Sequence, residues 1–571
     1  MKSNKLVALM LLVVMLTLSM TMLTTANAAK KPAFLTIMSE ESNGWVRNFN
    51  PNINNARHAA LGFMFEPLIL FDSFNNNKET PWLAEKIVTE PDFKTLTVYV
   101  RKGVKWSDGK DFTANDVAFT YNYPKTHPEI DRTGWWDHEG SATPGKIASV
   151  KIVDKYTVKI IMKEANRFWR NTIPFQVWML PEHIYSKVKD PATYVDKDPV
   201  ATGGFTKVKY CTPEMIVLGR NPKYWNAKNL SVDELRFPQF NGNQAALTLL
   251  QTGAIDWAHI FIPDAEKNYV QGDPDRKFWY GKNDGVRLAF NFMDENTDTL
   301  KAFKDVNFRR AVSLCVDRIG INKSAVFGYL SQDVPTVTGL PPALLGYADP
   351  KAQAELAKYT KYDINEAKKI LAKAGYKDVN KDGFLENPDG SKLAFEITSP
   401  AGWTDWNDGA AIVAQGLKKA GINATAKAID LAMYIESWRT GKRDILYCGY
   451  GITGDPYKFY YDTIGDQSRI KTDTWWTITD TNYANDQMTA LIASMPTAKD
   501  ADLKLVTAKI EQHFANNMIN VPIFYNGNWV VYNTSRFSGW ATANNVICNP
   551  ACVQHDSKLL QLFALKPVKD K

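Results

Sequence analysis

Residues 101–117 decide the fold of this chain. The segment reads Arg101-Lys102-Gly103-Val104-Lys105-Trp106-Ser107-Asp108-Gly109 and then, after two further residues, Phe112-Thr113-Ala114-Asn115-Asp116-Val117. Apolar and polar residues alternate just before it, over 96–100, which predicts a strand. Glycine at 103 and 109 predicts tight turns after that strand, because glycine adopts positive φ at no steric cost. A structural rather than ligand-binding role is therefore predicted for a set of charged residues, namely Arg101, Lys102, Asp108, Asp116 and Arg318.

Similar patterns recur along the chain and predict a mixed α/β protein. Further strands are predicted at 150–153, 157–161 and 393–398, and helices at 243–252, 308–324, 365–374, 408–420, 433–440 and 500–516. Asp363 is placed to cap the helix at 365–374, and Gly375 is placed to end it. Strands that alternate with helices indicate sheets covered by helices.

The N-terminus has the three parts of a secretory signal peptide. Lys2 and Lys5 precede an uncharged apolar run at 6–22, and the stretch ends in Ala26-Asn27-Ala28. The alternative, an uncleaved membrane anchor, fits less well because the run is short for ~30 Å of hydrocarbon. We expect cleavage before Ala29 and no lipid anchor, since no cysteine lies near that site. The mature protein is then periplasmic or extracellular.

Composition excludes several function classes. Hydrophobic residues make up 45% of the 571 residues and charged residues 23%, the balance of a globular protein. The formal net charge of +7 falls to +5 when the two signal-peptide lysines are removed. No block rich in Lys or Arg is present to follow phosphates, so a nucleic-acid partner is not expected.

Five cysteines leave at least one thiol unpaired. Cys548 and Cys552 are the disulfide candidate, because an oxidising compartment would allow them to pair across a tight turn. The alternative use, zinc binding, lacks a second Cys or His pair at the required spacing. Cys211, Cys315 and Cys448 lie in apolar surroundings and are expected to be buried thiols.

The segments taken together resemble a known family. The opening run 81–117 is followed in order by similar pieces at 202–205, 220–225, 291–292, 306–318, 362–376 and 382–383. This order resembles the family 5 extracellular solute-binding proteins, the dipeptide, oligopeptide and nickel receptors of ABC importers. The resemblance covers about residues 65–530, and it is the order of the motifs that makes it specific.

The resemblance implies a periplasmic-binding-protein-like fold of class II type, with two lobes, an additional inserted domain and a hinged cleft. The implied division is a signal peptide at 1–28, a split domain I at 29–65, 200–285 and 528–571, an inserted domain II at 66–199 and a domain III at 286–527. Chain crossings between the lobes are expected near 290–292 and 523–528. The protein would be a monomeric, non-catalytic receptor without a cofactor, and its partners would be a ligand and the membrane permease subunits.

The ligand class is read from a tryptophan cluster, Gly402-Trp403-Thr404-Asp405-Trp406, with Asp408 following. It resembles a motif of the oligosaccharide-binding branch of family 5. Indole rings can cover the apolar face of a sugar while carboxylates accept hydrogen bonds from its hydroxyls. The alternative is that Trp403 and Trp406 are core residues, since a spacing of three is also core spacing. Three further tryptophans are weaker ligand-binding candidates: Trp438, Trp475 and Trp476.

Two alternatives to an oligosaccharide receptor remain open. An oligopeptide receptor would hold the ligand's α-amine through an Asp in a segment resembling 450–456, where Asp455 is the candidate, although the segment is shortened here. An exported glycosidase would use Asp405 and Asp408 as paired carboxylates, but such pairs are common at helix starts. The chain contains no Gly-x-Ser-x-Gly or His-Glu-x-x-His motif.

One segment partly matches a calcium loop. Residues 378–386 place oxygen-bearing side chains alternately before Gly383, but Pro388 and Asp389 stand where the loop would end in a bidentate Glu. No metal is expected as part of the function. The weak candidate ligands are Asp378, Asn380, Asp382 and Asp389.

Overall fold

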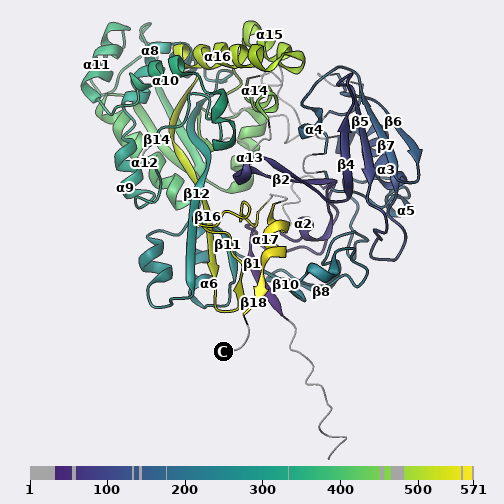
Figure 1. Ribbon diagram of the computed structural model, residues 1–571. Helices are drawn as coiled ribbons and strands as arrows, with labels where there is room; N and C mark the ends of the chain where they lie inside the picture. Colours follow the sequence, from purple (N-terminus) through teal and green to yellow (C-terminus); the bar gives the residue numbers. More distant parts are fainter. Residues whose placement is uncertain are drawn as a thin grey trace, which may run out of the picture.

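The computed structural model describes residues 33–53, 59–131, 134–139, 144–174, 177–331, 333–449, 455–464, 481–553 and 557–568. The predicted signal peptide lies outside the described residues. Strands and helices alternate through most of the chain, so the predicted α/β class is confirmed. Figure 1 shows the two lobes.

A ten-stranded sheet forms the frame of the molecule. Its strands are, in spatial order, β14 (Asn423–Ile429), β13 (Ala394–Pro400), β15 (Ile445–Gly449), β12 (Arg276–Phe290), β16 (Asn520–Asn533), β11 (Trp257–His259), β1 (Phe34–Met38), β10 (Glu234–Pro238), β9 (Met215–Gly219) and β8 (Lys207–Thr212). Strands from both ends of the sequence thus share one hydrogen-bonded surface.

The long antiparallel pair β12 and β16 joins the two lobes. From Arg276 to Lys282, β12 runs beside the half of β16 that pairs with β11. From Val286 it continues beside β16 and pairs with β15 on its other side. The register shifts between Lys282 and Gly285, where a bulge bends the strand. We call the described residues of 33–282 and 529–568 the first lobe and those of 286–525 the second lobe.

We place the crossing between the lobes at this register shift, at 282–285 on β12 and opposite it at Tyr525–Gly527 on β16. The second position lies inside the predicted range 523–528, and the first lies several residues before the predicted range 290–292. Both predicted ranges for the hinge stay predictions.

A smaller sheet lies at the side of the first lobe (Figure 1). Its order is β4 (Ala84–Thr89), β5 (Thr95–Val100), β7 (Thr157–Met162) and β6 (Ile147–Asp154), with helix α3 (Ala114–Thr126) packed on it. The strands predicted at 96–100, 150–153 and 157–161 are therefore confirmed. Two short pairs complete the strands, β2 (Ile69–Asp72) with β3 (Lys78–Pro81), and β17 (Phe537–Ser538) with β18 (Lys566–Pro567).

The segment 101–117 has the predicted structural role. Gly103 and Gly109 have φ of +78° and +100°. The side chain of Asp116 accepts a hydrogen bond from Thr113 N over 2.9 Å and completes a capping box at the start of α3. The guanidinium of Arg101 lies over the ring of Trp225, 4.6 Å from its centre.

Arg318 is likewise a packing residue. It donates hydrogen bonds to the carbonyls of Pro522 (2.7 Å) and Thr360 (2.9 Å), which ties α9 (Arg318–Ser324) to β16. The single helix predicted at 308–324 is wrong, because Asp317 caps a separate helix by accepting from Gly320 N over 2.8 Å. The residues before it form α8 (Val306–Leu314).

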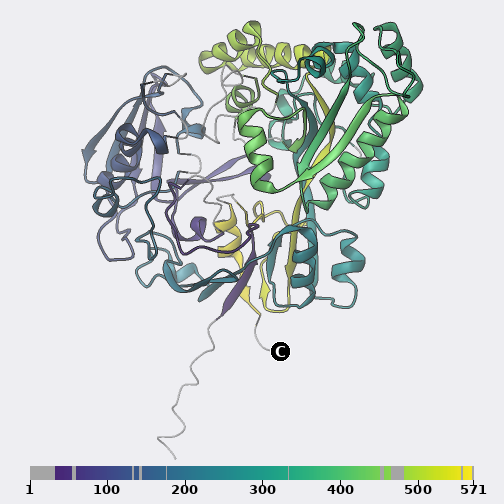
Figure 2. The same cartoon turned by 180° about the vertical axis from the view of Figure 1, so that it is seen from behind.

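Helices cover both faces of the sheet in the second lobe, and Figure 2 shows them from behind. α11 (Ile364–Lys373) has the predicted boundaries: Asp363 accepts from Glu366 N over 2.9 Å, and Gly375 has φ of +95°. The other second-lobe helices are α7 (Thr297–Lys304), α10 (Pro350–Ala357), α12 (Thr404–Lys419), α13 (Leu431–Thr440), α14 (Pro456–Ile464), α15 (Asp486–Ser494) and α16 (Asp500–Asn517). Those of the first lobe are α2 (Leu61–Met64), α4 (Trp169–Thr172), α5 (Glu182–Tyr185), α6 (Gly242–Gln251) and α17 (Lys558–Ala564).

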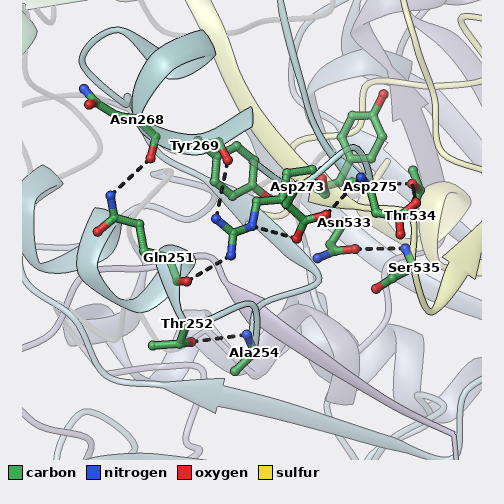
Figure 3. Close-up of polar contacts among 12 residues, drawn as sticks. Gln251, Thr252, Ala254, Asn268, Tyr269, Asp273, Asp275, Asn533, Thr534 and Ser535 are labelled. Atoms are coloured by element: carbon green, nitrogen blue, oxygen red, sulfur yellow. Dashed lines mark hydrogen bonds and ion pairs between the residues drawn. The ribbon is translucent and has the colours of Figure 1, made fainter. Parts of the chain in front are cut away.

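A polar network fixes the end of the β12–β16 pair that lies farthest from the crossing (Figure 3). Gln251 at the end of α6 donates to the carbonyl of Asn268 over 3.1 Å and accepts from Arg276 over 2.9 Å. Thr534 N donates to the carbonyl of Asp275 over 2.8 Å, just beyond the end of the strand pair at Arg276 and Asn533. These hydrogen bonds tie α6 and the loop after β16 to the start of β12. Within the described ranges, no helix is both long enough and apolar enough to cross a membrane.

Candidate functional site

The tryptophan cluster lies where β13 ends and α12 begins. Gly402 has φ of +85°, Trp403 occupies the N-cap position, and the helix starts at Thr404. The predicted start near Asp408 is therefore wrong by one turn. Asp405 and Trp406 belong to the first helical turn rather than to a loop, where a carboxylate complements the free backbone N–H groups.

The two tryptophans have different surroundings. Their rings meet edge to face with centres 4.9 Å apart. Trp406 is 7% exposed and packs against Tyr447 in the second-lobe core. Trp403 is half-buried, and its indole N–H donates to Glu41 Oε2 of the first lobe over 3.2 Å. Trp403 therefore lies at a contact between the lobes, whereas Trp406 supports it from the core.

Asn243, at the start of α6 in the first lobe, forms hydrogen bonds with residues 402–405 at the start of α12. Its Nδ2 donates to Thr404 Oγ1 over 2.9 Å and approaches Asp405 Oδ1 at 3.4 Å, and its N–H donates to the carbonyl of Gly402 over 3.1 Å. Asp405 is 3% exposed, and this burial raises the pKa of its carboxyl to about 7. Asp408 is exposed one turn later.

The two backbones approach each other directly at this contact. A Cβ added to Gly402 would lie 3.1 Å from the Cα of Gly242, and both glycines have positive φ. Side chains at either position would push the lobes apart. Glu41, Gly242 and Asn243 were not predicted as site residues, because pairing across such sequence distances leaves no local signal.

Two other predicted site residues, Trp438 and Asp455, do not join this contact. Trp438 is half-buried on α13 and packs edge to face against Tyr434, with ring centres 6.1 Å apart, so its contacts are those of a core residue. Asp455 is 2% exposed and accepts from Lys458 N over 2.7 Å at the start of α14. Burial raises its pKa to about 7. Trp475 and Trp476 lie outside the described residues.

The partial calcium loop is held together by its own hydrogen bonds. Asp378 accepts from Gly383 N over 3.0 Å, and Asn380 donates to Asp382 over 3.1 Å. Asp389 forms an exposed ion pair with Lys301 at 2.6 Å and accepts a hydrogen bond from the hydroxyl of Ser391 over 2.6 Å. In the part of the chain that the structure describes, no group of three His, Cys, Asp or Glu side chains is arranged for a metal.

The predicted disulfide is not formed. Cys548 and Cys552 are both buried free thiols, and Cys552 Sγ donates to the carbonyl of Met38 over 3.4 Å. The chain between them is fixed by other partners: Asn549 N donates to Asp72 over 2.9 Å, and Trp257 donates to the carbonyl of Pro550 over 2.8 Å. These contacts hold the two thiols in separate environments, and burial raises the pKa of both.

Comparison with known proteins now identifies the family. Residues 78–471, more than half of the chain, match the bacterial extracellular solute-binding proteins, family 5 (Middle). The chain belongs to family 5 of the bacterial extracellular solute-binding proteins. The family resemblance inferred from the order of the motifs is confirmed.

Curated relatives of this family 5 protein include two from well-known bacteria. The oligopeptide-binding protein AppA of Bacillus subtilis is 29% identical over 399 residues, which cover 68% of each chain. The periplasmic oligopeptide-binding protein OppA of Salmonella typhimurium is 24% identical over 492 residues, 81% of each chain.

Solved structures confirm the two-lobed fold of the family 5 protein. A periplasmic oligopeptide-binding protein of Thermotoga maritima with bound mannohexaose has a TM-score of 0.82 at 23% identity, covering 95% of this chain and all of that one. AppA of Bacillus subtilis with a nonapeptide has a TM-score of 0.73 at 22% identity, covering 94% of this chain and all of that one.

Proposed function

We propose that this family 5 protein is the exported substrate-binding component of an ABC importer, and that its ligand is an oligosaccharide held between the lobes. Family membership supports the receptor role. The observation that carries the ligand class is Trp403, a half-buried indole at the contact between the lobes with Asp405 beside it. The mannohexaose complex of the Thermotoga protein supports the view that this fold accommodates a chain of sugars.

An oligopeptide is the second candidate ligand. The curated relatives are named as oligopeptide-binding proteins, which favours it. Against it, Asp455, the candidate for capturing a peptide amine, is buried and already accepts a backbone hydrogen bond from its own helix. No catalytic role is proposed for Asp405 and Asp408, and a bound oligosaccharide would be returned intact.

The mechanism is a population shift. A ligand that contacts both lobes in the closed arrangement stabilises that arrangement, and the permease recognises it. The division into domains I, II and III and the monomeric state are part of this proposal. Location outside the cytoplasmic membrane is also part of it, and N-terminal sequencing of exported protein should return a start near Ala29.

A thermal-shift screen followed by calorimetry tests the ligand class. Mannohexaose, cello- and xylo-oligosaccharides would be compared with nonapeptides and shorter peptides, because a ligand that binds only the folded state raises its melting temperature. Binding of sugars alone supports the proposal. Binding of peptides alone, abolished by Asp455→Ala, would establish the second candidate. Small-angle scattering should show a smaller radius of gyration in the bound protein.

A further inference from the structure

A second contact between the lobes lies at residues 166–168, between β7 and α4. Asn166 N donates to the carbonyl of Phe93 over 2.8 Å, and its side chain accepts from Phe168 N over 2.8 Å. Trp169 donates from its indole to the carbonyl of Glu164 over 2.9 Å. These hydrogen bonds within the first lobe hold the segment rigidly, so Arg167 and Phe168 are presented to the second lobe in a fixed geometry.

Phe168 is inserted into the second lobe. Its side chain is 7% exposed and stacks on Tyr457 of α14, with ring centres 5.9 Å apart and planes 9° apart. Of the described residues in 66–199, it is the one buried in the hydrophobic core of the second lobe, while the other buried apolar residues there pack into the core of the first lobe. Opening of the lobes would therefore expose an aromatic ring to water.

Arg167 adds directional contacts to the same place. Its backbone N–H donates to the carbonyl of Pro496 over 3.1 Å, and its guanidinium donates to the carbonyl of Ala498 over 2.9 Å. The guanidinium also pairs with Asp500 at 2.6 Å, at the start of α16. The exposed ion pair contributes little by itself, whereas the charge-assisted bond to a carbonyl is stronger and depends on orientation. All three second-lobe partners lie within 496–500.

We propose that Arg167 and Phe168 form an interlobe latch that stabilises the closed arrangement without touching the ligand. The latch and the Trp403 contact use separate segments of both lobes, so the first can be weakened while the second stays intact. The apparent dissociation constant equals the intrinsic constant divided by the closed fraction. The latch therefore sets ligand affinity through that fraction. The predicted effect of the latch on ligand affinity rests on the proposed function, whereas its predicted effect on closure of the lobes does not.

Scattering of the ligand-free protein tests the latch directly. Phe168→Ala and Arg167→Ala should increase the radius of gyration relative to the parent, and the double variant should increase it most. Phe168→Leu keeps an apolar side chain in the pocket and should restore most of the parent value. Matched controls are Tyr99→Ala, a residue of β5 that is 40% exposed, and Arg47→Ala, whose ion pair with Asp198 lies within the first lobe. Circular dichroism would verify that each variant is folded.

Stopped-flow binding of mannohexaose gives the second readout. Phe168→Ala should weaken affinity by about tenfold if the closed fraction falls tenfold, mainly through faster dissociation, with Phe168→Leu close to the parent. If the folded Ala variants keep the parent's radius of gyration, the latch is overturned. If none of the oligosaccharides and none of the peptides in the screen binds, the proposed function fails while the scattering comparison still decides the latch.

Discussion

The indole Nε1 of Trp403 lies 3.2 Å from Oε2 of Glu41, a residue 362 positions earlier in the chain. The two residues belong to different lobes, so this hydrogen bond exists only while the lobes are together. Trp403 therefore combines two properties, a contact that forms on closure and an aromatic face at the meeting point of the lobes. Trp406 has neither property, because the second-lobe core surrounds it.

The two tryptophans should respond differently to truncation. Trp403→Ala should leave the melting temperature nearly unchanged and weaken oligosaccharide binding by ~2 kcal/mol, about thirtyfold, the usual cost of losing an aromatic anchor. Trp406→Ala should instead lower the free energy of unfolding by about 3–5 kcal/mol, because it leaves a cavity in a core. Calorimetry and thermal denaturation on both variants would measure this. Equal affinity of the folded Trp403→Ala variant and the parent would remove Trp403 from the site.

Stability should fall as pH rises from about 4.5 to 7. Glu511 is fully buried, accepts hydrogen bonds from the hydroxyls of Thr338 and Tyr460, and has its pKa raised by burial to about 7. A folded pKa above the unfolded value means that the stabilisation is complete below the unfolded pKa of about 4.5. It is lost between that pH and pH 7, by about 1.4 kcal/mol per pH unit for one group, with no further loss above pH 7. Glu511→Gln should flatten this loss in urea denaturation between about pH 4.5 and pH 7. The exposed Glu85→Gln should retain the parent's slope, and a parent with no slope contradicts the prediction.

The thiols should remain free in exported protein. Cys315, Cys448, Cys548 and Cys552 are buried, so a thiol reagent should react with them slowly in native protein and fully after denaturation. A reductant should leave the melting temperature unchanged. Mass spectrometry of alkylated protein that found a link between Cys548 and Cys552 would show that the pair closes after all.

Calcium should not stabilise the protein. Asp389 is engaged by Lys301, so the loop at 378–389 lacks its closing ligand. Thermal denaturation in about 1 mM calcium, the range in which extracellular calcium modules bind, should match that in a chelator. Lys301→Ala is the informative variant, because it releases Asp389: a calcium-dependent rise in that variant alone would show that the ion pair blocks the site.

The sequence correctly predicted those helices and strands whose boundaries depend on residues close together in the chain. The boundaries of α11 follow from Asp363 and Gly375, and the strands at 96–100 and 157–161 follow from alternation. The break between α8 and α9 was missed because the apolar periodicity continues across it, and the structure shows that Asp317 caps the second helix. A spacing of three could not separate Trp403 from Trp406, since only the tertiary structure decides which ring faces the other lobe. The partners Glu41, in the loop after β1, and Asn243, in α6, are distant in sequence, so their roles depend on the assembled sheet.

The ten-stranded sheet has a consequence for dissecting this protein. Since β12 and β16 each belong to both lobes, cutting the chain at the crossing would leave each fragment with severed strands and unpaired backbone N–H and C=O groups along an exposed edge. Such fragments should associate through those edges rather than persist as soluble single lobes. The same shared strands couple the unfolding of one half to that of the other, so the intact protein should melt in a single cooperative transition.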